Sequence, residues 1–373
     1  MKIMCMYLPQ FHSFPENDEW WGRGYTEWVA VRRGRPLYKG HIQPRVPENN
    51  QYYDLDSQAV ETFVRQAQLA KEYGIYGFSI YQYYFKGRKL MEKPLEALLA
   101  HPEIDIKYNL CWANESWTRT WYGLESQVLM EQSYGDEKDW REHFDYLLRF
   151  FKDERYIKVS NKPVYQIYKT FDIPCFKEMA ECFNKWAVEE GFDGIFFISA
   201  MTAAGYEQRS ECRSEINGYY YFEPGYSLKY GISKARMLKY NVSVALNSFL
   251  NRLRKEENRK LERFIDADWI YEAVTKREYG EHEYPGLIPD WDNTPRRSFK
   301  GLVYKGTSPE KFEKALKILI SKVNKSANEK TDKTCEDDFI YINAWNEWGE
   351  GAYLEPDEYR GYAYLEAVKR ACE

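Results

Sequence analysis

The sequence predicts a (β/α)₈ barrel, the TIM-barrel type of α/β fold, with long insertions after the first strand and between the sixth and seventh strands. Three observations support this prediction: short apolar runs, helical patterns between them, and polar and aromatic residues where most runs end. Several runs are apolar almost throughout, which is typical of parallel strands covered on both faces. The expected strands are residues 2–8, 75–81, 106–112, 163–168, 194–200, 216–222, 286–291 and 339–345.

Helical periodicity fills the intervals between these strands. Phe63, Ala67 and Ala70 repeat at helical spacing, and Gly74 supplies a C-terminal stop. Residues 140–151 and 179–186 carry similar apolar stripes. Ser308 followed by Pro309 predicts an N-cap and a first helical residue.

Two long segments extend the barrel, at residues 14–50 and at about 226–284. Within the second, the highly charged residues 251–263 are expected to form a solvated helix. No composition change marks a linker between globular units, so residues 1–373 are expected to form one domain.

Composition excludes several classes of function. The 373 residues include 53 basic and 58 acidic side chains, a net charge of −5, so no polycationic surface for nucleic acid is expected. No apolar run approaches the roughly 20 residues of a membrane span. The seven cysteines lack Cys-x-x-Cys spacing and the N-terminus reads as a strand, which favours a cytoplasmic location. The five histidines are scattered, so neither a metal nor a cofactor is expected.

Aromatic and polar residues gather where the expected strands end, which is the active-site face of such a barrel. Twelve Trp, 33 Tyr and 20 Phe suit either a sugar-binding cleft or a large core. The strand-end positions favour the cleft, because solvated loops have little need for tryptophan. The candidate substrate-binding residues are Tyr7, Gln10, His12, Trp21, Glu27, Trp28, His41, Tyr81, Tyr83, Trp112, Asn114, Glu115, Arg119, Trp291, Asp292, Trp345, Asn346, Trp348 and Glu355.

Glu347 and Glu350 are the candidate catalytic residues. They lie three residues apart with glycines interleaved, so a tight turn can bring the two carboxyl groups together. Glycosidic cleavage needs one protonated and one ionised carboxyl group, and proximity separates their pKa values. A rival pair is Glu115 with Glu347, because each follows an Asn at a strand end. Alternatively, Glu115 pairs with Arg119 and shapes the pocket.

Several longer motifs extend over most of the chain: Tyr7-Leu8-Pro9-Gln10-Phe11-His12, Asn17-Asp18-Glu19-Trp20-Trp21-Gly22, Lys39-Gly40-His41, Cys111-Trp112-Ala113-Asn114-Glu115, Trp291-Asp292-Asn293-Thr294 and Asn343-Ala344-Trp345-Asn346-Glu347-Trp348. Together they resemble the WbsX-type glycosyltransferase family of bacterial polysaccharide gene clusters. Gln82, Tyr84 and Tyr353 depart from that family's pattern. Since all three are expected near the cleft, they bear on the substrate and not on the fold.

The segment from Asn346 to Gly351, with Glu355-Pro356 beyond it, is similar to the catalytic segment of glycoside hydrolase family 99. Those enzymes are retaining endo-α-mannosidases built on a (β/α)₈ barrel. The resemblance implies that Glu347 acts as a base on the sugar 2-hydroxyl, with an anhydro-sugar intermediate. It implies that Glu350 protonates the leaving oxygen and then activates water.

Three functions are consistent with these residues. The first is a retaining glycoside hydrolase that cleaves an α-linked, mannoside-like bond in a bacterial polysaccharide or oligosaccharide. The second is a glycosyltransferase or transglycosylase of cell-surface polysaccharide biosynthesis. Three Asp-x-Asp patterns, at Asp54, Asp266 and Asp290, bear on it, although the first two suit helix starts. The third is a non-catalytic glycan-binding barrel. The oligomeric state is left open by the sequence.

Overall fold

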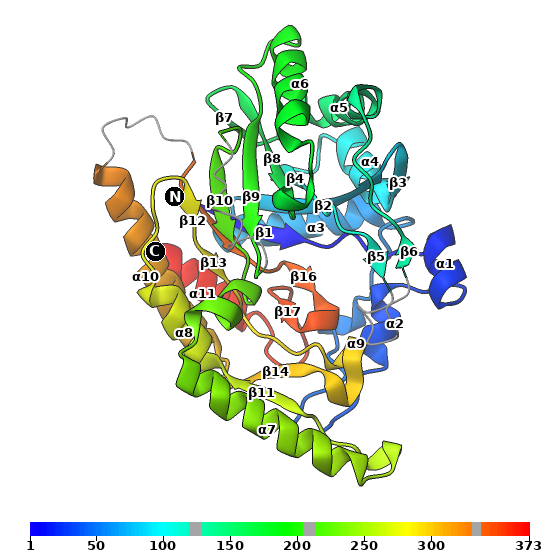
Figure 1. Cartoon of the computed structure of the whole chain (residues 1–373), viewed down its shortest axis with the longest axis vertical. Helices are drawn as coiled ribbons and strands as arrows, with labels where there is room; N and C mark the ends of the chain where they lie inside the picture. The colour runs from blue at the N-terminus through cyan, green and yellow to red at the C-terminus, as the bar shows by residue number, and fades with distance from the viewer. Residues whose placement is uncertain (119–127, 204–213, 330–336) are drawn as a thin grey trace.

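The computed structural model describes residues 1–118, 128–203, 214–329 and 337–373, and its centre is a barrel of parallel strands surrounded by helices (Figure 1). The predicted (β/α)₈ class is confirmed. Going around the barrel, the strand order is β12, β10, β9, β8, β4, β2, β1, β15, β13. The strands are β1 (Lys2–Tyr7), β2 (Gly77–Phe85), β4 (Lys107–Trp112), β8 (Lys162–Ile167), β9 (Phe196–Met201), β10 (Gly218–Tyr221), β12 (Glu283–Tyr284), β13 (Gly286–Leu287) and β15 (Phe339–Ile342).

The barrel closes through one interrupted strand. β12 pairs with β10 and β13 pairs with β15, while only Pro285 separates the two pieces in the chain. Proline lacks the N–H that a continuous ladder needs, but its carbonyl accepts from the Tyr341 amide at 2.9 Å. The seventh strand therefore spans residues 283–287, earlier than the predicted 286–291, which is a correction of its position.

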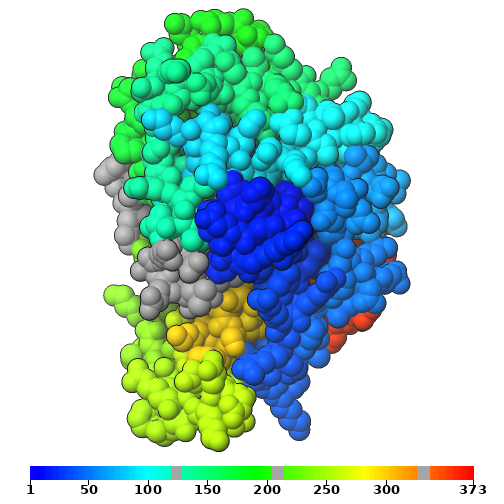
Figure 2. Space-filling model, turned by 90° about the vertical axis from the view of Figure 1, so that its right-hand side faces the viewer, coloured from blue at the N-terminus to red at the C-terminus, as the bar shows by residue number. Residues whose placement is uncertain are grey.

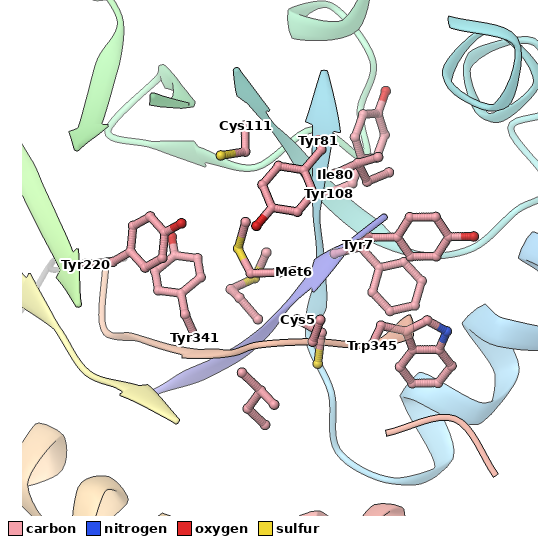
Figure 3. Packing of buried hydrophobic residues seen from close by; sticks show 14 of the residues in the cluster. Cys5, Met6, Tyr7, Ile80, Tyr81, Tyr108, Cys111, Tyr220, Tyr341 and Trp345 are labelled. Carbon is pink, nitrogen blue, oxygen red and sulfur yellow. The ribbon is translucent and has the colours of Figure 1, made fainter. Parts of the chain in front are cut away.

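Alternation along the strands separates two buried faces. Figure 3 shows Met6, Tyr81, Cys111, Tyr220 and Tyr341 gathered inside the barrel. Cys5 and Cys111 are buried free thiols, as their apolar surroundings predict. On the outer face, the Tyr7 ring stacks on Phe63 of the surrounding helix layer with centroids 5.3 Å apart. This alternation determines which aromatic side chains point into the barrel and which point toward the helices.

The main helices follow the predicted stripes. In α3 the residues Phe63, Ala67 and Ala70 are buried, and the Ser308 hydroxyl accepts from the Lys311 amide at the start of α10. The helices are α1 (Pro15–Trp21), α2 (Glu27–Arg32), α3 (Ala59–Glu72), α4 (Glu92–Ala100), α5 (Glu137–Phe151), α6 (Phe176–Glu189), α7 (Lys234–Arg252), α8 (Ala267–Lys276), α9 (Thr294–Arg297), α10 (Pro309–Glu329) and α11 (Ala363–Cys372). None of those in the described ranges combines the length and apolar character that crossing a bilayer requires.

Shorter elements lie in the segments between the barrel strands and the main helices. The short helical turns are η1 (Glu48–Asn50), η3 (Thr170–Asp172), η5 (Ser227–Gly231), η6 (Glu256–Asn258), η7 (Ser298–Lys300) and η8 (Trp348–Glu350). The remaining strands are β3 (Arg88–Leu90), β5 (Trp117–Thr118), β6 (Val128–Met130), β7 (Lys158–Val159), β11 (Arg263–Asp266), β14 (Leu302–Lys305), β16 (Asn346–Glu347) and β17 (Ala352–Tyr353).

The first insertion contains α1, α2 and η1, and the second contains η5, α7, η6, β11 and α8. The solvated helix expected at residues 251–263 is wrong. The long helix lies upstream as α7, because Ser233 caps its start and accepts from the Arg236 amide. The chain then folds back, since the Asn251 side chain bonds both the Lys260 amide and the Lys260 carbonyl.

Barrel closure depends on a residue without a side chain at Gly286. A Cβ there would lie 1.9 Å from the Tyr221 carbonyl oxygen, which is backbone and cannot rotate away. We expect Gly286→Ala to lower the free energy of unfolding by about 1–3 kcal/mol, measured by denaturant titration. Gly225→Ala is the control, because a Cβ there meets no atom within 4 Å and a change below about 1 kcal/mol is expected. Equal effects of the two substitutions would contradict this account of closure.

Candidate active site

A short hairpin after the eighth strand carries both candidate catalytic residues. β15 leads into β16, which ends at Glu347, and η8 then places Glu350 before the chain returns in β17. The Asn346 side chain anchors the hairpin to the first strand, since its Oδ1 accepts from the Leu8 amide at 2.8 Å and its Nδ2 donates to the Leu8 carbonyl at 3.0 Å. The two ends of the sequence thus fix the position of this hairpin.

One guanidinium group contacts three carboxylates at this point. Arg296 donates to Glu27 at 2.7 Å, and its other two nitrogens lie 2.9 Å from Glu347 and 2.9 Å from Glu350. The Glu27 side chain is fully buried and that of Arg296 is only 7% exposed. Three ionised carboxylates around one buried cation leave an excess of buried negative charge, and protonation of one of them reduces this excess.

Asp292 holds the helix that carries this arginine. Its Oδ1 accepts from the amide and the hydroxyl of Thr294 at the start of α9. Its Oδ2 lies 2.7 Å from His41 Nε2 and accepts from Gln43 at 2.8 Å. Burial by itself raises the pKa of Asp292, but the hydrogen bonds from His41 and Thr294 and the charge of Arg45 outweigh it and lower that pKa. Asp292 is therefore an ionised support behind Arg296.

Gly349 allows the close approach of these groups. A Cβ at this position would lie 1.7 Å from Glu27 Oε1 and 2.6 Å from Arg296 Nε. Since both atoms belong to the buried ion cluster, a side chain at 349 would displace it. The glycine between the two glutamates thus has a steric role as well as a role in the turn.

Glu347 and Glu350 form part of the wall of a cavity of about 350 Å³. The opposite walls are largely aromatic, with polar groups at a few points, which is the usual character of a small-molecule site. Its lining residues are Tyr81, Tyr83, Ala113, Glu115, Tyr168, Phe222, Pro224, Gly225, Leu228, Trp291, Asn293, Arg296, Arg297, Leu302, Tyr304, Glu347 and Glu350. Rings offer flat apolar surfaces, while the carboxylates and arginines can contact hydroxyl groups.

Burial shifts the titration of both glutamates. It raises the pKa of Glu347 to about 8; Arg296 opposes this shift, and the nearby Glu350 and Glu27 carboxylates add to it. Burial also raises the pKa of Glu350, again opposed by Arg296. The Glu347 side chain is 9% exposed and that of Glu350 is 24% exposed, so Glu350 faces the cavity more openly. The pair therefore holds a proton near neutral pH, as acid catalysis requires.

The structure places the predicted site residues in three groups. Those on the cavity wall are Tyr81, Tyr83, Glu115, Trp291, Glu347 and Glu350. Those that position the wall from behind are Glu27, Trp28, His41, Asp292, Asn346, Trp348 and Glu355. Those away from this cavity are Tyr7, Gln10, His12, Trp21, Trp112, Asn114 and Trp345. Arg119 lies outside the described residues.

Glu355 is an anchor beneath the hairpin and does not reach the cavity. Its carboxylate accepts from the Trp348 indole at 2.7 Å, from the Tyr53 hydroxyl at 2.9 Å and from Gln66 at 2.7 Å. The Trp28 indole donates to the Tyr53 carbonyl at 2.8 Å, and its ring contacts Trp348. These contacts fix the back of the turn that carries Glu350.

Strand parity explains why other predicted residues miss the cavity. Tyr81 and Tyr83 point inward from β2, so Gln82 and Tyr84 point outward, where both contact His143 of α5. Trp112 shares that outer layer and donates its indole N–H to the Tyr84 carbonyl at 3.1 Å. Tyr353 stacks on Trp348. The three departures from the family pattern, expected near the cleft, therefore lie in its supporting layer.

Glu115 reaches the cavity, while its expected partner Arg119 lies outside the described residues. It forms an ion pair with Lys169, which follows the fourth barrel strand. Asn114 joins the same two loops, since its Oδ1 accepts from the Lys169 amide at 2.7 Å and its Nδ2 donates to the Lys169 carbonyl at 2.8 Å. Lys169 and Asn114 thus hold the loop that places Glu115 in the cavity wall.

The sequence reasoning missed the arginines of α9. Arg296 and Arg297 both line the cavity, together with Asn293. A signal was present, because two adjacent arginines follow the Trp291-Asp292-Asn293 motif at the end of the seventh strand. A cation at that position is what a carboxylate pair needs nearby.

The Asp-x-Asp patterns are occupied by structural contacts. Asp54 accepts from the amides of Asp56 and Ser57, and Asp266 caps α8. Asp290 lies 3.0 Å from Arg45, and Asp292 supports α9 as described. Among the residues that the structure describes, no group of three or more His, Cys, Asp or Glu side chains has a metal-binding arrangement.

The family model described as glycosyltransferase WbsX matches residues 3–368. The chain belongs to this family. Its predicted resemblance is thereby confirmed, and the family is one of carbohydrate-active enzymes. "Uncharacterized protein WxcX" of two strains of Xanthomonas campestris pv. campestris is 33% identical over 370 residues. The alignment covers 99% of the present chain but only 49% of each relative, so the chain spans about half the length of these curated relatives.

Two solved structures have a fold similar to this WbsX-family chain. The GH99 endo-α-mannosidase from Bacteroides thetaiotaomicron aligns with a TM-score of 0.56 at 13% identity, covering 99% of this chain and 96% of that one. A glycoside hydrolase-like protein aligns with a TM-score of 0.53 at 12% identity, covering 99% and 93%. At such identities the likeness concerns the fold, and it confirms the barrel class.

The raised pKa of Glu347 predicts a pH-dependent contribution to stability. The folded chain holds this proton up to about pH 8, whereas an unfolded glutamate releases it near 4.5. The contribution of protonated Glu347 to the free energy of unfolding is therefore complete below pH 4.5 and is lost as pH rises toward 8. We expect the unfolding free energy of wild type to fall by a few kcal/mol relative to Glu347→Gln across this window, at ~1.4 kcal/mol per pKa unit.

Chemical denaturation at several pH values measures this difference. Glu178→Gln, at an exposed position in α6, is the control and should follow wild type at every pH. Parallel pH curves for wild type and Glu347→Gln would show that Glu347 ionises alike in the folded and unfolded chain.

Proposed function

We propose that this chain is a retaining glycoside hydrolase that cleaves an α-linked, mannoside-like bond in a bacterial polysaccharide or oligosaccharide. The observation that supports it most is the placement of Glu347 and Glu350 against one guanidinium in the wall of an aromatic cavity. Hydrolysis of glycosides needs two carboxyl groups of opposite protonation state beside one bond. A family description and a fold similarity alone would not single out these two residues.

Glu350 is the proposed acid and Glu347 the proposed base, as the family 99 resemblance implies. Glu350 gives its proton to the glycosidic oxygen while Glu347 takes the proton of the 2-hydroxyl. The 2-oxygen then bonds the anomeric carbon as the bond to the leaving group breaks. In the second step Glu350 takes a proton from water, the water oxygen opens the anhydro ring, and Glu347 returns a proton to the 2-oxygen.

Side-chain exposure and pKa favour different assignments of acid and base to Glu350 and Glu347. The larger exposed fraction of Glu350 suits contact with a leaving group at the open side of the cavity. The pKa of about 8 at Glu347 favours the proton on that residue while the cavity is empty. Because the two groups are close, binding of a sugar hydroxyl can redistribute one shared proton between them. Separate tests of each glutamate are therefore needed.

The alternative is glycosyl transfer, which the family description favours. A transglycosylase would use the same two glutamates, with a sugar hydroxyl in place of water. A nucleotide-sugar transferase with an Asp-x-Asp metal site finds less support, because the aspartates of these patterns already cap backbone amides or pair with basic residues.

Mass spectrometry of reaction products tests the hydrolase proposal directly. Wild type is incubated with α-linked oligosaccharides and bacterial polysaccharides, with and without nucleotide sugars. We expect fragments without any nucleotide, and a loss of about 10²- to 10⁴-fold in turnover for Glu350→Gln with glycan binding retained. Chain extension that requires a nucleotide sugar would overturn the proposal. Full turnover in Glu350→Gln, with loss in Glu115→Gln, would shift the catalytic pair to Glu115 and Glu347.

An activated leaving group separates the acid from the base. The dinitrophenolate of a dinitrophenyl glycoside leaves without being protonated. A variant that lacks only the acid should therefore recover most of its turnover with this substrate. We expect recovery in Glu350→Gln and none in Glu347→Gln, measured by release of the dinitrophenolate. Recovery in Glu347→Gln alone would reverse the two roles.

A further inference from the structure

Helix α7 carries large apolar side chains on the side turned away from the protein. Of the eleven large apolar residues that are exposed in the described part of the chain, six lie on this helix or immediately after it. Their exposed fractions reach 60% at Phe249 and 73% at Leu253. The set is Leu238, Val242, Leu246, Phe249, Leu250 and Leu253, and we call it the α7 stripe.

The side of α7 that packs on the protein combines the partly buried Met237 and Tyr240 with polar anchors. Asn247 donates to the Glu262 carbonyl at 3.0 Å, and the buried Asn251 bonds the Lys260 backbone next to β11. A helix that covers a globular protein normally keeps polar residues on its outward side, whereas α7 has large apolar residues there as well. The outward apolar residues are therefore not explained by packing within this chain.

Basic residues border the α7 stripe. Residues 232–255 contain six Lys or Arg and no Asp or Glu, although the whole chain has a net charge of −5. At 3.6 residues per turn, Leu238, Val242, Leu246, Phe249 and Leu253 fall within about 80° around the helix axis. The same geometry places Lys234 and Arg252 along one border of the stripe and Lys239 along the other.

Ion pairing distinguishes these bordering cations from Arg236. Within residues 1–118, 128–203, 214–329 and 337–373, no ion pair joins Lys234, Lys239, Arg252 or Lys255 to a carboxylate, whereas Arg236 pairs with Glu272 at 2.7 Å. Figure 1 shows α7 at the lower edge of the molecule, beyond β11, β14 and α8. In Figure 2 the same region forms the yellow-green lobe at the lower end.

We propose that α7 docks this chain onto the surface of a membrane that contains anionic lipids. Such a surface supplies both components that the helix lacks: an apolar layer for the stripe and negatively charged headgroups for the cations on its borders. A second copy of the chain fits less well, because two such faces would bring like charges together. This inference depends on α7 and not on the chemistry proposed for the cavity.

Vesicle sedimentation tests the proposal with the full chain. We expect binding to phosphatidylcholine vesicles that contain phosphatidylglycerol, about tenfold weaker binding to phosphatidylcholine alone, and weakening as salt rises. Leu246→Asp with Phe249→Asp should reduce binding about tenfold or more, and Lys239→Glu with Arg252→Glu should remove the preference for anionic vesicles. Val188→Asp is the matched control, because Val188 on α6 is also 60% exposed.

Circular dichroism of each variant establishes that its fold is retained. Absence of wild-type binding to the anionic vesicles would overturn the proposal, as would equal binding by wild type and the Leu246/Phe249 variant. Light scattering tests the alternative, in which a second copy of the chain contacts α7. If wild type self-associates, the Leu246/Phe249 variant does not, and neither binds vesicles, α7 is a contact between copies and the membrane proposal is wrong.

Discussion

The site depends on one buried guanidinium that must satisfy three carboxylates. Arg296 lies between Glu27, Glu347 and Glu350, so full ionisation would set three negative charges against this one guanidinium in a volume from which water is largely excluded. A retained proton is the least costly way to relieve that excess, and burial raises the pKa of both hairpin glutamates accordingly. Arg296 therefore links the position of α9 on the hairpin with the raised pKa values of the two glutamates.

Much of the fold could be predicted because it depends on local patterns. Apolar runs marked seven of the eight strands at their observed positions, and stripes such as Phe63, Ala67 and Ala70 marked helices that cover them. The two misplaced segments have specific causes. Pro285 interrupts the seventh strand, and the charges of residues 251–263 resembled a solvated helix although Asn251 reverses the chain there.

The candidate site was predictable as far as composition and position along the chain allow. Glu347 and Glu350 do lie in a cavity wall, and so do Tyr81, Tyr83, Glu115 and Trp291. What the motifs could not reveal is direction: Tyr7 and Trp112 occupy the outer parity of their strands, so the same strand ends carry residues for both the cavity and the helix layer. The Arg296-Arg297 pair was visible in the sequence, but its contacts with three carboxylates form only where the hairpin and α9 meet in space.

The pairing of the first and last barrel strands separates the chemistry from the chain ends. β1 and β15 lie side by side and parallel, and both lead toward the hairpin at their carboxyl ends. Their amino ends therefore lie on the opposite face, where Cys372 also approaches Gly74 ahead of β2, and Figure 1 shows N and C close together. Another polypeptide module joined at either end would thus leave from the rear of the barrel. In relatives about twice as long, such an architecture would allow extra sequence to be gained or exchanged without obstructing the mouth of the cavity.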